Sequence, residues 1–525
     1  MAKKILVTEQ IAEEAIEMLR DAGYEVETHN GMSTEELVKT IPGFDAMIVR
    51  GGTDVTREVY DAADCLKIIG RAGLSTDNID LETATERGVI VCNAPASNNI
   101  SAAEQTFGMM IAAARNIVQA DHSMKRHEWR RSDFEGIELN GKTLAIFGLG
   151  RVGSLVAARA QAFGMNVVAH DPFCSRARSL DMGVKMYDSL EEILPVADFI
   201  TIHLPRNKNT IGIFGPKEYA MMKDGVILVD CSRGGILDAK VMADFVAAGK
   251  IRACAVDVWK EYPCTDSPLH EFENAILTPH LVAATKEAQL RAGTMIAEYV
   301  MNGLEGSLVP TMVNSAALPE EVREAVGPYV PACKFIGSTL AQLRGDIPSK
   351  VKLTCAGTLV GCNTDVLVAA FLEGVLSYKK SAAVSPTNAL AIAKRHGIRV
   401  ETSYASGAGE YASFVRIDAD QLSMACTFTE AGQTPRIVSL LGYKIDIAPA
   451  KHSLIFEYED TPGRIGIIGT ILGEAGINIT TMQIGTKPAE RNALVYLNVE
   501  SEVPEEVLDC LKNSMDMYNL WYIKR

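Results

Sequence analysis

The sequence lacks the features that mark several classes of protein. No apolar run reaches the roughly 18 residues that span a bilayer, and no Lys/Arg cluster is long enough to follow a phosphate backbone. The formal net charge of −15 also disfavours a nucleic-acid partner. Aromatic residues are scarce, at 6%, yet 47% hydrophobic and 22% charged residues are the balance of a folded globular protein. We therefore expect neither a membrane nor a nucleic-acid partner.

Paired cysteines and metal-ligand motifs are also missing. The 11 cysteines are scattered without a CxxC pair, and neither zinc-type spacing nor HExxH occurs. The first residues, Met1 to Val7, read directly as a strand, with no apolar segment of a signal peptide. We therefore expect reduced thiols, no metal site and a cytoplasmic location.

The 525 residues suggest three or four domains, at about 150 residues per domain. Short apolar runs alternate with helix-period segments, which predicts parallel sheets with crossover helices. One such series fills the first hundred residues, and a second begins at Thr143. The strands predicted are Lys4–Thr8, Val26–His29, Phe44–Arg50, Leu66–Arg71, Val89–Cys92, Thr143–Gly148, Asn166–His170, Phe199–Leu204, Val226–Cys231, Ala253–Val258 and Ala275–Thr278.

Helix signals add detail to this pattern. Capping-box spacing predicts helix starts at Ser33, with Glu36, and at Ser101, with Glu104. The helix that follows, Ala102–Ala114, is apolar nearly all round, so we expect it to be buried at a domain or subunit contact.

The C-terminal third has a different organisation. Ser315–Pro331 interrupts the pattern and is predicted to be a linker, and a mixed segment follows from about residue 335 to 448. The last seventy or so residues run strand, helix, strand, strand, helix, strand, the order of a ferredoxin-like unit. These elements are predicted at Ser453–Tyr458, Ile465–Ala475, Ile479–Gly485, Ala493–Val499, Glu505–Leu511 and Trp521–Lys524.

A dinucleotide fingerprint follows the first strand of the second series. The sequence from Gly148 to Gly153, with Gly150, Arg151 and Val152 between, fits GxGxxG before a helix, and Asp171 ends the next strand. Glycines let the backbone approach a pyrophosphate at the helix N-terminus, and the Asp can bind a ribose diol. A carboxylate there repels a 2′-phosphate, which favours NAD over NADP. The alternative is a glycine-rich turn with a surface Asp.

Charged groups gather after later strands of the same series. Arg233 lies in Cys-Ser-Arg-Gly-Gly, His280 in Thr-Pro-His, and Asp257 and Glu261 in Asp-Val-Trp-Lys-Glu-Tyr-Pro. The carboxyl ends of parallel strands are where such folds bind ligands. Hydride transfer needs a proton acceptor, which a His can be, and a cation for a carboxylate, which Arg supplies. Taken singly, each of these residues could also be an ordinary loop residue.

These motifs resemble the D-isomer-specific 2-hydroxyacid dehydrogenases. The resemblance rests on Asn93-Ala-Pro, Ser101-Ala-Ala-Glu, the run from Trp129 to Arg131, Glu138-Leu-Asn-Gly-Lys-Thr, the glycine loop, Cys231-Ser-Arg-Gly-Gly and Thr278-Pro-His. The two C-terminal segments narrow it to the long-form D-3-phosphoglycerate dehydrogenases, which have an intervening domain and an ACT domain. The resemblance implies NAD and a catalytic Arg, Glu and His, carried over to Arg233, Glu261 and His280, with Asp257 at the cofactor.

The resemblance also implies a substrate site and an effector site. Arg50 and Arg71 are expected to bind the phosphate and Ser75 to contact the substrate, and Arg131 can add a cation from a neighbouring subunit. In the ACT domain, Tyr458, Asp460 and Asn478 are expected to bind L-serine, with Asp460 accepting from its ammonium group. A domain that only dimerises is the alternative. Paired ACT domains imply a homo-oligomer, a dimer or tetramer.

The fold implied is α/β, with two doubly wound parallel-sheet domains of Rossmann or flavodoxin-like type, an α/β intervening domain and a ferredoxin-like ACT domain. Residues 1–97 and 283–314 would bind substrate, 98–282 NAD, 315–448 would be the intervening domain and 449–525 the ACT domain. The expected reaction is oxidation of D-3-phosphoglycerate to 3-phosphohydroxypyruvate, the first step of the phosphorylated route to serine, with serine feedback.

Several positions depart from the family pattern. The family places its Glu directly before the Pro, where this sequence has Tyr262, so that Glu261 stands one residue early. The segments Leu74–Thr76, Arg206–Asn207 and Val282–Thr285 also differ. Two alternatives therefore stay open. One is a dehydrogenase for another D-2-hydroxyacid, and the other is a non-catalytic regulator that senses NAD and an amino acid.

Overall fold

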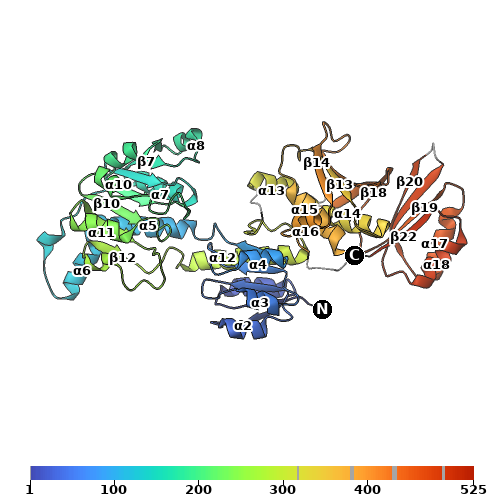
Figure 1. Cartoon of the computed structure of the whole chain (residues 1–525), viewed down its shortest axis with the longest axis horizontal. Helices are drawn as coiled ribbons and strands as arrows, with labels where there is room; N and C mark the ends of the chain where they lie inside the picture. The colour runs from blue at the N-terminus through green and yellow to red at the C-terminus, as the bar shows by residue number, and fades with distance from the viewer. Residues whose placement is uncertain (1, 316–318, 379–383, 429–433, 488–490, 525) are drawn as a thin grey trace. The chain divides into compact units, whose positions relative to one another are not determined.

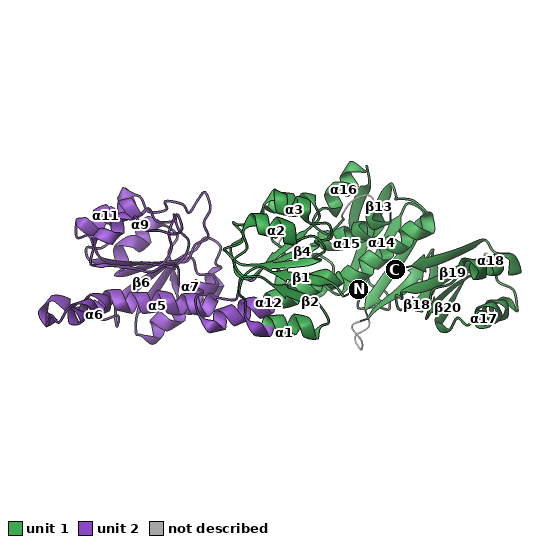
Figure 2. Cartoon of the chain, turned by 90° about the horizontal axis from the view of Figure 1, so that it is seen from below, with its two compact units in different colours: residues 1–10, 15–93, 296–525 green, residues 11–14, 94–295 purple. Residues whose placement is uncertain are grey.

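The computed structural model describes residues 2–315, 319–378, 384–428, 434–487 and 491–524, and it divides the chain into two compact units. Unit 1 comprises residues 1–10, 15–93 and 296–525, and unit 2 comprises residues 11–14 and 94–295 (Figure 2). No helix in the described parts of the chain is long and apolar enough to cross a membrane. Within the same residues, no cluster of His, Cys, Asp and Glu could hold a metal ion.

Unit 1 begins with a five-stranded parallel sheet in the order β2-β1-β3-β4-β5. Each of its strands has four residues. The apolar strand β3 is buried along its whole length, whereas β2, at the edge of the sheet, is mostly exposed. Ser33 and Glu36 form the predicted capping box of α2. The elements are β1 (Lys4–Val7), α1 (Glu13–Asp21), β2 (Glu25–Thr28), α2 (Thr34–Thr40), β3 (Ala46–Val49), α3 (Arg57–Ala62), β4 (Ile68–Arg71), α4 (Leu81–Glu86) and β5 (Ile90–Asn93).

Unit 2 contains a seven-stranded sheet in the order β12-β11-β10-β9-β6-β7-β8, all parallel. Strand order reverses at β6, next to β9, which is the switch point where this fold binds dinucleotides. The strands are β6 (Thr143–Phe147), β7 (Asn166–His170), β8 (Lys185–Met186), β9 (Phe199–Ile202), β10 (Val226–Asp230), β11 (Ile251–Val256) and β12 (Ala275–Leu277).

Helices cover both faces of this sheet (Figure 1). The apolar helix α5 (Asn99–Arg115) packs on α7 and on β10 and β11, so its burial is accounted for within unit 2. The capping box predicted at Ser101 is wrong, because the N-cap is Asn98 and the Ser101 hydroxyl lies 2.7 Å from that of Thr285. The other helices of unit 2 are α6 (Ile117–Lys125), η1 (Arg131–Phe134), α7 (Arg151–Ala162), α8 (Arg176–Asp181), α9 (Leu190–Ile193), η2 (Leu194–Val196), α10 (Pro216–Met221), α11 (Ala239–Ala247) and η3 (Pro268–Glu271). The next helix, α12 (Lys286–Glu305), begins in unit 2 and belongs to unit 1 from Ile296 on.

The segment after α12 is not only a linker. Within residues 315–331, α13 (Glu320–Val326) and the start of α14 (Tyr329–Arg344) are helical, and residues 316–318 lie outside the described residues. A mixed sheet in the order β14-β13-β15-β16-β17-β18 follows, packed against α14 and α15. The remaining elements of this sheet region are β13 (Lys350–Gly357), α15 (Asp365–Ser377), α16 (Ala389–Arg395), β14 (Arg399–Tyr404), β15 (Ser413–Ala419), β16 (Leu422–Phe428), β17 (Pro435–Leu440) and β18 (Tyr443–Ile447).

The last elements form the predicted ferredoxin-like unit. Its antiparallel sheet has the order β20-β21-β19-β22, and α17 and α18 cover one face (Figure 1). The element order confirms the prediction, and the elements are β19 (His452–Glu459), α17 (Arg464–Glu474), β20 (Ile479–Lys487), β21 (Asn492–Val499), α18 (Glu505–Ser514) and β22 (Asn519–Lys524).

Candidate active site

The glycine loop between β6 and α7 has the geometry of a dinucleotide site. A Cβ on Gly148 would lie 2.6 Å from the carbonyl oxygen of His203, and one on Gly153 would lie 2.1 Å from that of Gly148. A Cβ on Gly150, by contrast, would meet no atom of the described residues within 4 Å. Two glycines are therefore required by packing, and the third leaves open space at the start of α7. Arg151 and Val152 form the first turn of that helix.

Among the residues that the structure describes, no side chain caps the N-terminus of α7, so its first N–H groups are available to an anion. At the end of β7, Asp171 accepts a hydrogen bond from the backbone N–H of Leu149 at 2.8 Å. This bond brings the carboxylate beside the glycine loop, where the sequence predicts it to bind the ribose. The loop thus fits a dinucleotide: it offers space at Gly150, free donors and an acidic residue.

The candidate reaction centre is built on three neighbouring strands of the same sheet. Asp230 is paired with Val256, and Val256 with Leu277, so β10, β11 and β12 end at one edge. Arg233 and His280 follow at that edge, each three residues after its strand. The structure therefore brings together the loops that carry the predicted cation and the predicted proton acceptor.

The His280 loop is held in an uncommon backbone conformation. His280 has a φ of +59°, a region that a non-glycine residue rarely adopts. The fully buried carboxylate of Asp257 accepts hydrogen bonds from the N–H groups of Leu281 and Val282, at 2.8 and 3.1 Å, and from the hydroxyl of Thr278. Asp257 thus fixes the residues on both sides of His280. The sequence leads us to expect only that Asp257 binds the cofactor.

The loop that carries Arg233 packs closely against the segment after β11. A Cβ on Gly234 would lie 1.6 Å from the carbonyl oxygen of Trp259, so only glycine permits this approach. Arg233 is half-buried, and its guanidinium donates to the carbonyl of Ser232 at 2.7 Å. Asp230 accepts from the N–H and the hydroxyl of Ser232, and burial raises the pKa of this carboxyl to about 6. Asp230 is a site residue that the sequence did not single out.

Glu261 and Tyr262 differ in their contacts with His280. Glu261 is exposed, and the structure records no hydrogen bond or ion pair for it among the described residues. The Tyr262 ring is stacked on the imidazole of His280, with the ring centroids 5.3 Å apart and 26° between the planes. The predicted pairing of Glu261 with His280 stays a prediction.

The predicted phosphate-binding residues lie together in unit 1. Arg50 follows β3 and Arg71 ends β4, and Val49 is paired with Arg71 in the sheet. A Cβ on Gly73 would clash with the Arg71 guanidinium, so this glycine leaves room for it. The backbone around Arg50 is held by Glu9, whose carboxylate accepts from the N–H of Arg50 at 2.8 Å.

The neighbouring loop carries Ser75. Its hydroxyl donates to the carboxylate of Asp77 at 2.7 Å. The side chain of Asn78 donates to the carbonyl groups of Arg50 and Thr53, which ties this loop to the one after β3. Ser75 therefore stands at the same edge of the sheet as the two arginines.

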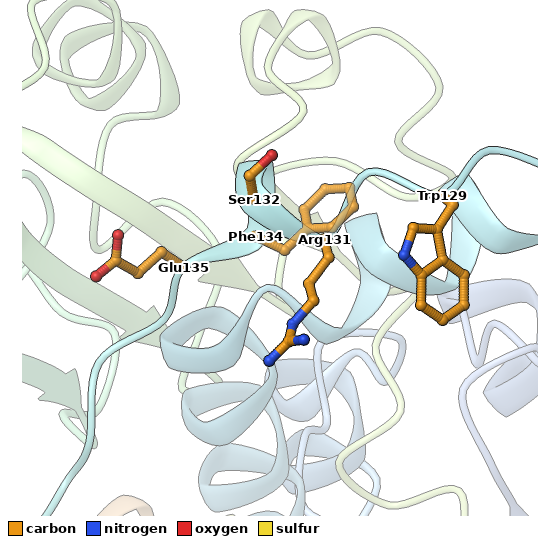
Figure 3. A pocket seen from close by; sticks show the side chains of 5 residues that line it. All are labelled: Trp129, Arg131, Ser132, Phe134 and Glu135. Atoms are coloured by element: carbon orange, nitrogen blue, oxygen red, sulfur yellow. The ribbon is translucent and has the colours of Figure 1, made fainter.

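Arg131 lines a pocket of its own in unit 2. The cavity measures about 750 Å³, and Figure 3 shows the side chains around it. Trp129 is 80% exposed beside it. The full lining is Trp129, Arg131, Ser132, Phe134 and Glu135.

Known proteins resemble the chain along its whole length. Family models match three segments: the NAD binding domain of D-isomer specific 2-hydroxyacid dehydrogenases (residues 107–282), the D-3-phosphoglycerate dehydrogenase intervening domain (325–440) and the ACT domain (452–514). The D-3-phosphoglycerate dehydrogenase of Methanocaldococcus jannaschii is 42% identical over 511 residues, 97% of each chain. This chain belongs to the D-3-phosphoglycerate dehydrogenase family. It is an NAD-dependent dehydrogenase of the 2-hydroxyacid type.

Other members and solved structures agree with the family assignment. The D-3-phosphoglycerate dehydrogenase of Bacillus subtilis is 36% identical, covering 98% of both chains. The TT0316 protein of Thermus thermophilus superposes with a TM-score of 0.55 at 31% identity, over 59% of this chain and 99% of its own. D-lactate dehydrogenase from Escherichia coli gives 0.54 at 26% identity, over 59% and 99%. The resemblance inferred from the motifs is thus confirmed.

The effector residues expected for this family lie at two ends of one sheet. Asp460 follows β19, and its N–H donates to the carbonyl of Arg491, just before β21. Asn478 precedes β20 and donates to the carboxylate of Glu500, just after β21. The eight residues of β21 separate these positions by about 25 Å, so one ACT domain does not bring them together. Tyr458 is buried in β19, and burial raises the pKa of its phenol, with Asp460 adding to the shift.

Proposed function

We propose that this dehydrogenase oxidises D-3-phosphoglycerate to 3-phosphohydroxypyruvate with NAD, the first step of the phosphorylated route to L-serine. One observation carries the proposal: Arg233 and His280 follow β10 and β12, the two strands on either side of β11, at the edge where the family binds its substrate. Full-length similarity to D-3-phosphoglycerate dehydrogenases supports the choice of substrate.

The reaction removes a hydride from C2 of the substrate and a proton from its hydroxyl group. The glycine loop would hold NAD, with Asp171 at its ribose, and the bound cofactor would supply the hydride acceptor. His280 accepts the hydroxyl proton, so that the C2–O bond becomes a carbonyl. Arg233 binds the carboxylate and polarises the C2 oxygen, because a guanidinium presents two parallel donors to such a group.

The substrate phosphate is assigned to Arg50 and Arg71. Two guanidinium groups suit a dianion, and both stand after neighbouring strands of one sheet. The negative charge of Glu9 at the same edge is balanced by hydrogen bonds from the N–H groups of Arg50 and Gly52. Ser75 contacts the substrate through its loop, and Arg131 is a further cation that acts on a neighbouring subunit.

Regulation by L-serine is assigned to the ACT domain. A helix N-terminus at α17 can bind the amino acid's carboxylate, and Asp460 can accept from its ammonium group. Since Asp460 and Asn478 lie at opposite ends of β21, a site that uses both needs two copies of the chain. We therefore expect a homo-oligomer, a dimer or tetramer, with ACT domains paired. We also expect the protein in the cytoplasm.

The test compares His280→Ala with the wild-type protein. NAD reduction with D-3-phosphoglycerate should fall at least a thousandfold, while the Kd of NADH, followed by its fluorescence, stays within about twofold. Retained turnover in His280→Ala would contradict the role of His280. If the wild type turns over other D-2-hydroxyacids but not D-3-phosphoglycerate, the assignment of the substrate is wrong and the proposed mechanism still holds.

A further inference from the structure

The loop after β11 and the loop after β12 are joined by side-chain hydrogen bonds. The Asp257 carboxylate accepts from the hydroxyl of Thr278 before His280 and from the backbone N–H groups of Leu281 and Val282 after it. The indole of Trp259 donates to the carbonyl of Thr278 at 3.0 Å, two residues before His280. Trp259 is buried, so the segment after β11 forms a fixed base under the His280 loop.

Tyr262 extends this base to the imidazole itself. Its hydroxyl accepts a hydrogen bond from the backbone N–H of Trp259 at 3.1 Å, and its ring is stacked on His280. Both ends of the side chain are therefore engaged, although 55% of the residue is exposed. Glu261, its neighbour, is exposed and makes no recorded hydrogen bond or ion pair in the described part of the chain.

We infer that Tyr262 is the residue that positions His280 for proton transfer, in the place where the family pattern has a Glu. This inference deepens the proposed function and rests on it. A stacked ring limits rotation of the imidazole and leaves the edge of the ring, where both nitrogens lie, open to substrate. Tyr262 acts through His280 and is a positioning residue.

The phenol differs from a carboxylate in charge. Burial raises the pKa of Tyr262, so the phenol is neutral at the pH where a His titrates. The charged groups that act on its hydroxyl are Asp257, Arg233 and Asp230. A Glu at position 262 would add a negative charge beside His280, which favours the protonated imidazole and raises its pKa. The native residue orients His280 without that charge.

Three substitutions of Tyr262 separate these effects. Tyr262→Phe keeps the ring, so we expect kcat within about threefold of the wild type. Tyr262→Leu removes the stacking, and kcat should fall at least tenfold while the Kd of NADH is unchanged. Tyr262→Glu should move the acidic limb of the pH profile of kcat/KM upward by about half a pH unit or more, because the added carboxylate raises the pKa of His280. Asp257, Arg233 and Asp230 are the same in every variant, so they do not contribute to the difference.

The rival assignment is tested with Glu261→Gln. If Glu261 supports His280, this variant loses at least tenfold in kcat and Tyr262→Leu stays within twofold, and that result would overturn the inference. An unchanged pH profile in Tyr262→Glu would also contradict it, since position 262 would then not face the imidazole.

A measurement that does not depend on turnover tests this inference independently of the proposed function. Diethyl pyrocarbonate acylates neutral imidazoles, and peptide mass spectrometry gives the rate at His280 alone. Without the stacked ring, His280 should react at least threefold faster in Tyr262→Leu than in the wild type or Tyr262→Phe. Equal rates in all three would refute the positioning role. If the wild type oxidises no 2-hydroxyacid yet binds NADH, the proposed function fails, and the acylation rates still decide where Tyr262 lies.

Discussion

The carboxylate of Asp257 accepts a hydrogen bond from the backbone N–H of Leu281 at 2.8 Å, directly after the proton acceptor of the proposed reaction. This contact joins the ends of two parallel strands. It means that the orientation of His280, whose φ is +59°, depends on a side chain 23 residues earlier in the sequence.

Removal of this carboxylate should release the His280 loop. In Asp257→Ala three hydrogen bonds that hold the segment around the left-handed backbone at His280 are lost. We expect kcat at saturating NAD to fall by about a hundredfold or more. Asp257→Asn keeps one acceptor oxygen and should lose less. Equal losses in both variants would mean that charge, not loop geometry, matters at this position.

Two glycines of the cofactor loop should respond differently to substitution. Gly153→Ala places a methyl group 2.1 Å from the carbonyl oxygen of Gly148, which should lower the thermal unfolding midpoint and abolish NADH binding. In Gly150→Ala the added methyl group has no atom of the described part of the chain within 4 Å, so the unfolding midpoint should match the wild type. Its methyl group fills the space for the pyrophosphate, and NADH should bind at least tenfold more weakly. Normal binding by Gly150→Ala would show that the cofactor does not approach this loop.

The buried carboxyl of Asp230 should make stability depend on pH. Its pKa is about 6 in the folded protein and about 3.9 in the unfolded chain, so the folded state binds the proton more tightly. The wild type therefore loses stability as pH rises from about 4 to about 6. Asp230→Asn lacks this loss and should be more stable at pH 8 by roughly 1 to 3 kcal/mol.

The advantage of Asp230→Asn should shrink by about half at pH 5. Scanning calorimetry of the wild type and of Asp230→Asn at pH 5 and pH 8 measures this difference in stability. A stability difference that is the same at pH 5 and pH 8 would show that Asp230 does not titrate in this range.

Asp460 should be required for the response to serine. In Asp460→Ala the ammonium group of serine loses its acceptor, so serine added at millimolar concentration should no longer lower the rate of NAD reduction. Each protein is compared with its own rate without serine. Undiminished inhibition in Asp460→Ala would place the effector elsewhere, and a wild type that does not respond to serine would favour an ACT domain that only dimerises.

Local patterns predicted the sheets and the cofactor loop because both are encoded in short segments. Short segments of four to seven residues predicted the parallel strands except the two-residue β8, and the glycine spacing placed the loop between β6 and α7. The ferredoxin-like order at the C-terminus was equally readable, since each strand there alternates with a helix or a turn at a regular distance.

Contacts between distant segments could not be predicted in this way. The Ser101 hydroxyl contacts Thr285 instead of capping a helix, and α13 forms inside the segment expected to be a linker. The stacking of Tyr262 on His280 depends on how two loops meet, which no spacing in the sequence encodes. The resemblance to a family drew attention to Glu261, but only the structure shows which neighbour faces the imidazole.

The most direct test of the central claim is the initial rate of NAD reduction by the full-length protein with D-3-phosphoglycerate at alkaline pH, with hydrazine to trap the keto acid. We predict robust turnover that exceeds the rate with any other D-2-hydroxyacid of similar size. No turnover with D-3-phosphoglycerate, by a folded protein that binds NADH, would contradict the proposed function.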